Sequence, residues 1–185
     1  MLNAEIASDL TVDQWLKVEY KNAKKAGIPL IASLGYNPEE IRELAPKVAA
    51  IGVDALELST HYLGNDPTPI IEVTKVAKEV VDIPVFIKLS PNVLDITQFA
   101  KAAEDAGADG IVAINTLGPC LAIDIENAMP MLGSANGYGW LSGPAIKSLA
   151  VRCVADIARA VKIPIIGVGG ISTGRDAIEF IMAGA

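Results

Sequence analysis

Polar residues stand at the ends of several short apolar runs, and three of these positions could carry chemistry. Lys88 lies near the end of VFIKLS, and Asn115 closes GIVAIN beside Thr116. His61, the only histidine of the chain, follows ALELST and precedes Tyr62. An ammonium group can hold an anion, and a carboxamide can hydrogen-bond a planar heterocycle through both its donor and its acceptor. An imidazole can take and give protons near neutral pH.

The alternation of side chains in VFIKLS predicts where the Lys88 ammonium points. Successive residues of a strand face opposite sides, so Val85, Ile87 and Leu89 share one face while Lys88 shares the other with Phe86. If the aliphatic face packs against helices, Lys88 points into a barrel. An inward lysine is costly unless it meets an anion or a polar ligand, so we predict that Lys88 binds a ligand. The alternative is a lysine whose amine reaches solvent from the strand end.

Asn115 and a glycine turn are further candidate ligand sites. By the same alternation Asn115 points inward beside Thr116, where it either binds a ligand or forms a buried amide satisfied within the protein. Gly169-Gly170, followed by Ser172-Thr173, leads a strand into a helix N-terminus with exposed backbone N–H groups. Such a turn can cradle a phosphate, although many connections use glycines only to turn the chain.

The elements that must position these residues form a repeated strand–helix unit. Short β-rich runs alternate with segments of helical spacing at a period of roughly 25 to 30 residues. Each run reads as a strand buried on both faces, which is typical of a parallel sheet in an α/β protein, closed into a barrel or doubly wound. The predicted strands are Pro29–Leu34, Ala55–Thr60, Val85–Ser90, Gly110–Asn115 and Ile165–Gly169.

Helix boundaries can be predicted from capping patterns. Asn37 precedes a proline and two glutamates, which predicts a helix N-cap, and Thr68-Pro69 repeats the device. The regular spacing breaks between the last two strands, where residues 117–144 are rich in Gly, Pro and Asn. We predict a long functional loop there, a lid or a binding excursion, before a helix through Ile146–Val161.

Composition and charge exclude several classes of protein. Apolar residues make up 51% and charged residues 20% of the 185, as expected of a compact globular protein. A formal charge of −7 argues against a nucleic-acid partner. Cys120 and Cys153 form no framework, the N-terminal stretch is acidic, and no uncharged run could span a bilayer, so we expect a cytoplasmic protein without a membrane anchor. A homo-oligomer or a partner chain is compatible with this composition.

Several motifs together resemble one known family. IKLSPNVLDITQFAKAAEDAGADGIVAINT, LSGPAIK and IPIIGVGGISTGRDAIEFIMAGA are similar to the dihydroorotate dehydrogenase family of FMN-binding (β/α)8 TIM barrels, which includes dihydropyrimidine dehydrogenase relatives. The resemblance runs from about Pro29 to the last residue and depends on the combination of KLSPN, INT, SGPAIK and the glycine turn. It implies an FMN-dependent oxidoreductase of pyrimidine metabolism that acts on a CH–CH bond of a small pyrimidine-like substrate.

The resemblance also implies roles for individual residues. Lys88 would sit near flavin N1 and O2, where its charge stabilises the anionic reduced flavin. Asn115 and Thr116 would contact the substrate and the flavin edge, and the glycine turns would line the path of the ribityl phosphate. No metal site is implied. The implied cofactor contacts are Ser33, Ser59, Lys88, Asn115, Gly143, Gly169 and Gly170.

The segment after ALEL departs from the family pattern. The family normally has Asn-x-Ser-Cys-Pro-Asn there, with the cysteine as the base that removes a substrate proton. In this chain Ser59 takes the place of the asparagine and Tyr62 that of the cysteine, so His61 stands next to the catalytic position. Three interpretations are open: His61 or Tyr62 acts as a replacement acid/base, both only bind substrate while water carries the proton, or the site has lost its chemistry.

Length is the second departure from the family. We count five strands in residues 1–185 and expect a single domain, the middle and late part of the barrel without its first two strands and its eighth. Two other functions stay open on this basis. One is a non-catalytic barrel fragment or pseudoenzyme that needs a partner chain. The other is a flavin-free, phosphate-binding β/α-barrel enzyme with Lys88 as an amine nucleophile.

Overall fold

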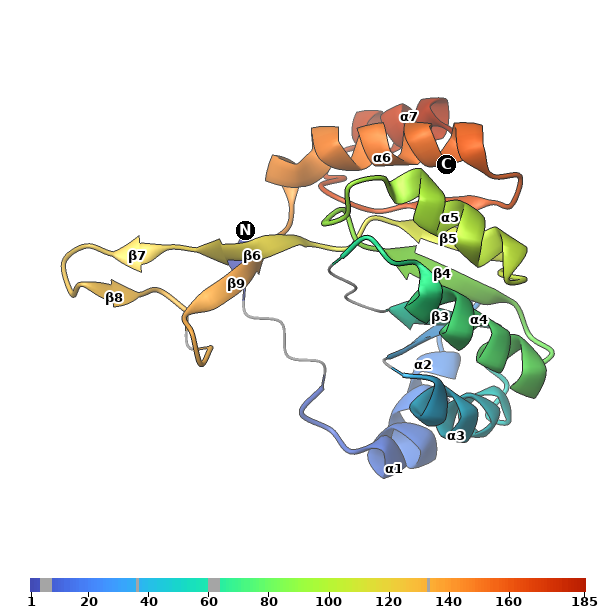
Figure 1. Ribbon diagram of the computed structural model, residues 1–185. Coiled ribbons are helices and arrows are strands. Elements are labelled where there is room, and N and C mark those ends of the chain that lie inside the picture. The colour runs from blue at the N-terminus through green and yellow to red at the C-terminus, as the bar shows by residue number, and fades with distance from the viewer. Residues whose placement is uncertain (4–7, 36, 60–63, 133) are drawn as a thin grey trace.

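A parallel sheet forms the centre of the fold. The computed structural model describes residues 1–3, 8–35, 37–59, 64–132 and 134–185. Within these ranges the sheet has the strand order β10-β5-β4-β3-β2 (Figure 1). The order follows the sequence without a reversal, as in a β/α barrel and unlike a doubly wound sheet, so the barrel-type α/β prediction is confirmed. The strands are β2 (Ile31–Leu34), β3 (Ala55–Ser59), β4 (Val85–Leu89), β5 (Gly110–Ala113) and β10 (Ile165–Gly167).

Helices connect the strands and cover one face of the sheet. Parallel crossovers are right-handed, so consecutive connections place their helices on the same side. In the described part of the chain, no helix is long and apolar enough to cross a membrane. The connecting helices are α3 (Pro38–Ala49), α4 (Thr68–Val80), α5 (Ile96–Asp105), α6 (Lys147–Ala160) and α7 (Gly174–Ala183). A helical segment precedes β2 and consists of α1 (Val12–Gln14), the π-helix η1 (Trp15–Glu19) and α2 (Tyr20–Lys24).

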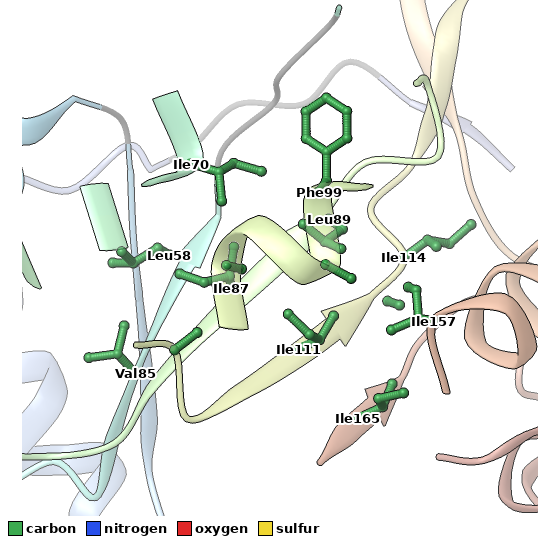
Figure 2. Close-up of a cluster of buried hydrophobic side chains, with 14 of the residues drawn as sticks. Leu58, Ile70, Val85, Ile87, Leu89, Phe99, Ile111, Ile114, Ile157 and Ile165 are labelled. Atoms are coloured by element: carbon green, nitrogen blue, oxygen red, sulfur yellow. The ribbon is translucent and has the colours of Figure 1, made fainter. Parts of the chain in front are cut away.

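The hydrophobic core lies between the sheet and these helices. Leu58, Ile87 and Ile111 are fully buried on the helix-facing side of their strands (Figure 2). The opposite face is less covered, since Ile31 on β2 is 42% exposed and Ile166 on β10 is 37% exposed. The prediction that every strand is buried on both faces is therefore wrong for the two edge strands, whereas all four residues of β5 are buried.

Helix caps and strand entries follow local side-chain chemistry. Asn37 caps α3 as predicted, because its Oδ1 accepts a hydrogen bond from the N–H of Glu40 at 2.9 Å. The predicted Thr68 cap is wrong: α4 begins at Thr68, whose N–H and hydroxyl both donate to Asp66 Oδ1, at 2.9 and 2.6 Å. At the strand entries, the carboxylates of Asp54 and Asp109 accept from backbone N–H groups at the starts of neighbouring strands.

The segment predicted as a long loop forms an antiparallel ribbon. The ribbon projects away from the sheet (Figure 1), and β1 (Leu2–Asn3) pairs with its last strand. The predicted long loop therefore contains regular strands, and its role as a lid or a binding excursion stays a prediction. A short 3-10 helix η2 (Pro144–Ile146) then leads into α6, within the predicted helix. The ribbon strands are β6 (Leu117–Leu121), β7 (Ile123–Asp124), β8 (Met129–Pro130) and β9 (Tyr138–Leu141).

Candidate functional site

A pocket of about 350 Å³ lies where β4, β5 and β10 end. The C-terminal ends of parallel strands are where β/α barrels place their sites. The chain after β5, the turn before α6 and the turn after β10 all contribute to its walls. The pocket brings together six of the residues singled out in the sequence, namely Lys88, Asn115, Thr116, Gly143, Gly169 and Gly170. Its other lining residues are Ile114, Ser142, Ile146, Gly167, Val168 and Ile171.

Lys88 points away from the helices, as its alternation predicts. Its neighbours Ile87 and Leu89 are buried in the core, whereas Lys88 lines the pocket. The Lys88 side chain is only 23% exposed, and its Nζ lies 3.8 Å from Glu57 Oε1. A largely buried ammonium group is costly without a partner of opposite charge, so Glu57 accounts for part of the stability of this arrangement.

Glu57 is a site residue that the sequence reasoning missed. Its side chain is 16% exposed and accepts a hydrogen bond from Ser33 Oγ at 3.0 Å. Ser33, Glu57 and Lys88 therefore form a polar row across β2, β3 and β4 on the face opposite the helices. The signal was present in ALELS, where two buried leucines alternate with Glu57 and so assign it to the other face.

The remaining predicted site residues lie elsewhere or outside the described residues. Ser33 does not line this pocket but a separate hollow of about 510 Å³, beside Trp15 and Tyr20. Ser59 pairs in register with Lys88 at the end of β3 without lining the pocket. His61 and Tyr62 lie outside the described residues. The roles of all four stay predictions.

Asn115 is held firmly in the pocket wall. It is 5% exposed, and its backbone N–H donates to the carbonyl of Leu89 at 2.8 Å. Its side-chain Oδ1 accepts from the N–H of Thr116 at 2.9 Å. These bonds fix the chain direction immediately after β5. The Asn115 and Thr116 side chains are thus placed against the pocket by backbone as well as side-chain contacts.

Two glycine turns, at Gly143 and at Gly169-Gly170, form part of the pocket wall. Gly170 has a backbone φ of +71°, a conformation that residues other than glycine rarely adopt. A Cβ atom at Gly170 would lie 2.6 Å from the backbone oxygen of Gly143 and 3.0 Å from Pro144 Cα. The turn after β10 therefore packs backbone against backbone on the turn before α6. This wall can exist only because Gly170 carries no side chain.

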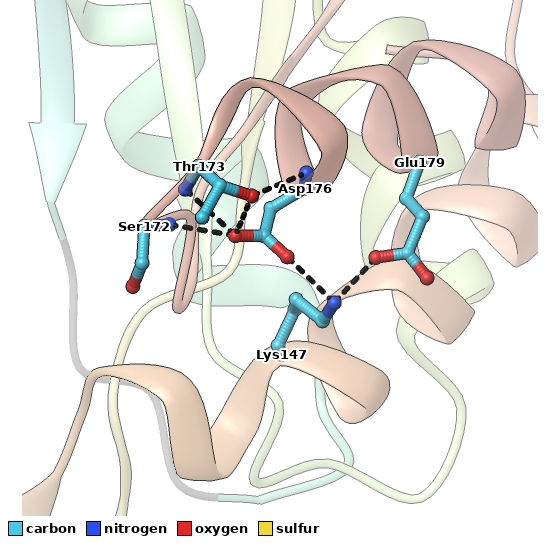
Figure 3. A network of polar contacts seen from close by, with 5 residues as sticks. All are labelled: Lys147, Ser172, Thr173, Asp176 and Glu179. Carbon is cyan, nitrogen blue, oxygen red and sulfur yellow. Dashed lines mark hydrogen bonds and ion pairs between the residues drawn. The ribbon is translucent and has the colours of Figure 1, made fainter.

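The N-terminus of α7 does not offer the exposed N–H groups that the sequence predicted. Asp176 Oδ2 accepts from the backbone N–H groups of Ser172 and Thr173, at 3.1 and 2.7 Å, and from the Thr173 hydroxyl at 2.8 Å (Figure 3). Thr173 and Asp176 form a reciprocal capping box. The prediction is wrong for Ser172 and Thr173, and an anion at this turn would have to be bound by other groups.

Lys147 ties the beginnings of α6 and α7 together. Its Nζ lies 2.7 Å from Asp176 Oδ1 and also contacts a carboxylate oxygen of Glu179 (Figure 3). A positive charge at the first residue of a helix opposes the helix dipole, and the two carboxylates offset that cost. The hydrogen bonds from Lys147 and then from Thr173 hold the pKa of Asp176 far below its ordinary value. The network therefore holds together the starts of α6 and α7, the two helices that follow the glycine turns.

Asp176 should make the stability of the fold depend on pH. Its folded pKa lies below the ordinary value of 3.8, so the unfolded chain takes up the proton first as the pH falls. We expect Asp176→Asn to be less stable than wild type at neutral pH, and the difference to shrink progressively below pH ~4. Urea unfolding of both proteins at a series of pH values from neutral to acidic measures this difference in stability.

The matched control for this prediction is Asp13→Asn, which removes the partner of Lys17 in an exposed pair on α1 and η1. Exposed ion pairs contribute little, so this variant should follow the wild-type stability closely. A difference between wild type and Asp176→Asn that stays constant from neutral to strongly acidic pH would contradict the prediction.

Comparisons with known proteins agree with the geometry. A sequence model of the family described as dihydroorotate dehydrogenase matches residues 59–185. A protein of Methanocella arvoryzae named dihydroorotate dehydrogenase B (NAD(+)), catalytic subunit, is 45% identical over 177 residues, which cover 90% of this chain and 57% of the relative. A protein of the same name from Anoxybacillus flavithermus is 43% identical over 100% of this chain and 62% of the relative. The chain thus spans somewhat over half the length of these relatives.

A solved structure supports the fold independently. The structure, assigned to a deoxyribose-phosphate aldolase of Toxoplasma gondii, superposes with a TM-score of 0.59 at 19% identity and covers 93% of this chain and 66% of its own. At that identity the likeness concerns the fold alone. The matched family model and the identities over most of the chain confirm the resemblance seen in KLSPN, INT and SGPAIK. The chain belongs to the dihydroorotate dehydrogenase family.

Proposed function

We propose that this chain provides the FMN and substrate pocket of a dihydroorotate dehydrogenase-like oxidoreductase, which oxidises a CH–CH bond of a pyrimidine-like ring. The observation that carries the proposal is the pocket that unites Lys88, Asn115 and Thr116 with the glycine turns at Gly143 and Gly170. This set combines one cation, two hydrogen-bonding side chains and a backbone wall. A flat, anionic ligand rich in heteroatoms is best bound by such a combination.

The residues present fit FMN on two structural grounds. Lys88 offers a partly desolvated positive charge on one wall of the pocket. The lack of a side chain at Gly170 also lets two backbone turns meet, and both turns line the same pocket. Lys88 and Asn115 would hold the ring, and Gly143 and Gly170 would hold the ribityl phosphate. When bound, FMN supplies the two-electron acceptor that amino-acid side chains lack.

The protein's own residues would manage charge and protons. Oxidation of dihydroorotate removes a proton from one ring carbon and a hydrogen with its electron pair from the neighbouring carbon. The Lys88 ammonium would stabilise the negative charge that accompanies the electrons. By sequence position, we assign the removal of the proton to Tyr62, which stands at the place of the family's cysteine, or to His61 beside it. Asn115 and Thr116 would orient the ring.

A partner chain is part of this proposal. The relatives are named catalytic subunits of an NAD(+)-dependent enzyme. A subunit named as the catalytic one belongs with at least one further subunit, which would carry the electrons on to NAD(+). We therefore propose that this protein works in the cytoplasm with an electron-accepting subunit, in a complex that can also contain a second copy of the chain.

Anaerobic single turnover tests the proposal. The purified chain is loaded with FMN, freed of unbound flavin by gel filtration, and mixed with L-dihydroorotate. We expect the visible flavin absorption to disappear and orotate to form in an amount equal to the FMN reduced. A chain that retains no FMN, or retains FMN that dihydroorotate leaves oxidised, would refute the proposed activity.

A further inference from the structure

Asn92, in the KLSPN motif after β4, connects two loops beside the pocket without lining it. Its Nδ2 donates to Ser90 Oγ at 2.9 Å and to the backbone oxygen of Thr116 at 3.1 Å. Its Oδ1 accepts from the backbone N–H of Gly118 at 3.1 Å. One carboxamide thus holds the loop after β4 to the chain that follows β5.

Of the side chains that could stand at position 92, only a carboxamide of this length can hydrogen-bond both the Thr116 carbonyl and the Gly118 N–H. The Thr116 carbonyl needs a donor and the Gly118 N–H needs an acceptor, and asparagine presents both from a single planar group. Aspartate would keep the acceptor for Gly118 but set a second oxygen against the Thr116 carbonyl. Alanine would remove both bonds. The interaction is therefore specific for asparagine at position 92.

The segment that Asn92 holds lies directly in the pocket wall. Thr116 lines the pocket, and β6 begins at the next residue, Leu117. Leu117 pairs with Leu141 at the end of β9, and Ser142 and then Gly143 follow as pocket residues. A shift of the chain at 116–118 would therefore reach both the Asn115–Thr116 wall and, through the pairing of Leu117 with Leu141, the turn at Gly143.

We propose that Asn92 is a positioning residue, which fixes the pocket wall formed by Asn115 and Thr116 for binding of the pyrimidine-like substrate. Its effect on substrate rests on the proposed function. Asn92 acts through the backbone of Thr116 and Gly118, so its loss should weaken substrate binding more than it slows the chemical step. Substrate contacts that are equal in the ground state and the transition state appear in KM rather than in kcat.

The first test measures how firmly the pocket wall is held in the chain without bound ligand. We compare Asn92→Ala with Asn37→Ala, which removes a side-chain hydrogen bond of the same kind at the α3 cap, where Asn37 does not line the pocket. Amide hydrogen exchange at Gly118 should become about tenfold faster in Asn92→Ala, because the partly buried hydrogen bond from the Gly118 N–H is lost, and stay unchanged in Asn37→Ala. Unchanged exchange at Gly118 in Asn92→Ala would overturn the proposal.

The second test measures the consequence for substrate. Asn92→Ala should raise KM for dihydroorotate about tenfold with kcat changed less than about threefold, whereas Asn37→Ala should leave both unchanged. Asn92→Asp should keep slow exchange at Gly118 yet raise KM, because it keeps the acceptor for Gly118 but can no longer donate to the backbone oxygen of Thr116 or to Ser90 Oγ. An unchanged KM in Asn92→Ala despite fast Gly118 exchange would also overturn the proposal. A wild-type chain inactive toward dihydroorotate counts against the proposed function, and the exchange comparison still decides whether Asn92 fixes the wall.

Discussion

Replacing Lys88 by methionine should lower the rate of FMN reduction by dihydroorotate at least about a hundredfold, because a preorganised charge at the developing negative charge is typically worth that much. Methionine keeps the length and apolar stem of lysine but carries no charge. The Lys88 ammonium lies on the pocket wall, 23% exposed, where low solvent access strengthens its field. The rate is measured by anaerobic stopped-flow absorbance of bound flavin.

Two control variants separate the effect of losing the Lys88 charge from any loss of folding stability. Lys88→Met leaves the Glu57 carboxylate, 16% exposed, without its cationic neighbour, so the double variant with Glu57→Gln removes that unpaired charge. The double variant should regain stability and remain slow. Lys78→Met removes a similar partly buried lysine, paired with Asp109 away from the pocket, and should reduce FMN at the wild-type rate. Wild-type-like reduction in Lys88→Met would defeat the role assigned to this lysine.

Gly170→Ala should lower the free energy of unfolding by about 3 kcal/mol, from backbone strain together with overpacking. The residue has φ +71°, and its new Cβ would meet the Gly143 backbone oxygen at 2.6 Å. Backbone cannot rotate aside as a side chain can, so the two glycine turns must separate. FMN affinity should fall more than tenfold as the wall opens. Urea unfolding and flavin fluorescence titration measure the two effects.

Gly174→Ala is the matched control for the glycine prediction. Gly174 is the first residue of α7, and a Cβ there would have no atom within 4 Å. Alanine at this position should leave stability equal to wild type or raise it by up to about 1 kcal/mol, since alanine favours helix. Equal stability and equal FMN affinity in the two variants would show that the close approach of Gly170 to Gly143 has no energetic weight.

The repeated strands and most of the pocket could be predicted from the sequence. Alternation in VFIKLS assigned Lys88 to the face away from the helices, since the side-chain period of a strand is a local property. The glycine turns and INT lie at strand ends, and the C-terminal ends of parallel strands meet at one edge of the sheet. Local pattern and simple topology were therefore enough to bring Lys88, Asn115 and Gly170 together.

What the sequence reasoning missed depends on contacts between distant or competing groups. The ribbon forms because Leu117 pairs with Leu141, a contact across the whole segment that its Gly, Pro and Asn content does not suggest. The Thr68 cap failed because the Asp66 carboxylate, a stronger acceptor, takes up both donors of Thr68. The N–H groups of Ser172 and Thr173 were expected to be exposed, but Asp176, within their own capping box, accepts from both.

A crystal structure of the chain soaked with FMN shows whether the pocket that contains Lys88 binds the flavin. We expect density for the isoalloxazine ring in the pocket at the ends of β4, β5 and β10, with Lys88 Nζ within hydrogen-bond reach of its N1–O2 edge and the phosphate at the Gly143 and Gly170 turns. FMN bound at another surface, or a ring in this pocket that Lys88 does not contact, would contradict this expectation.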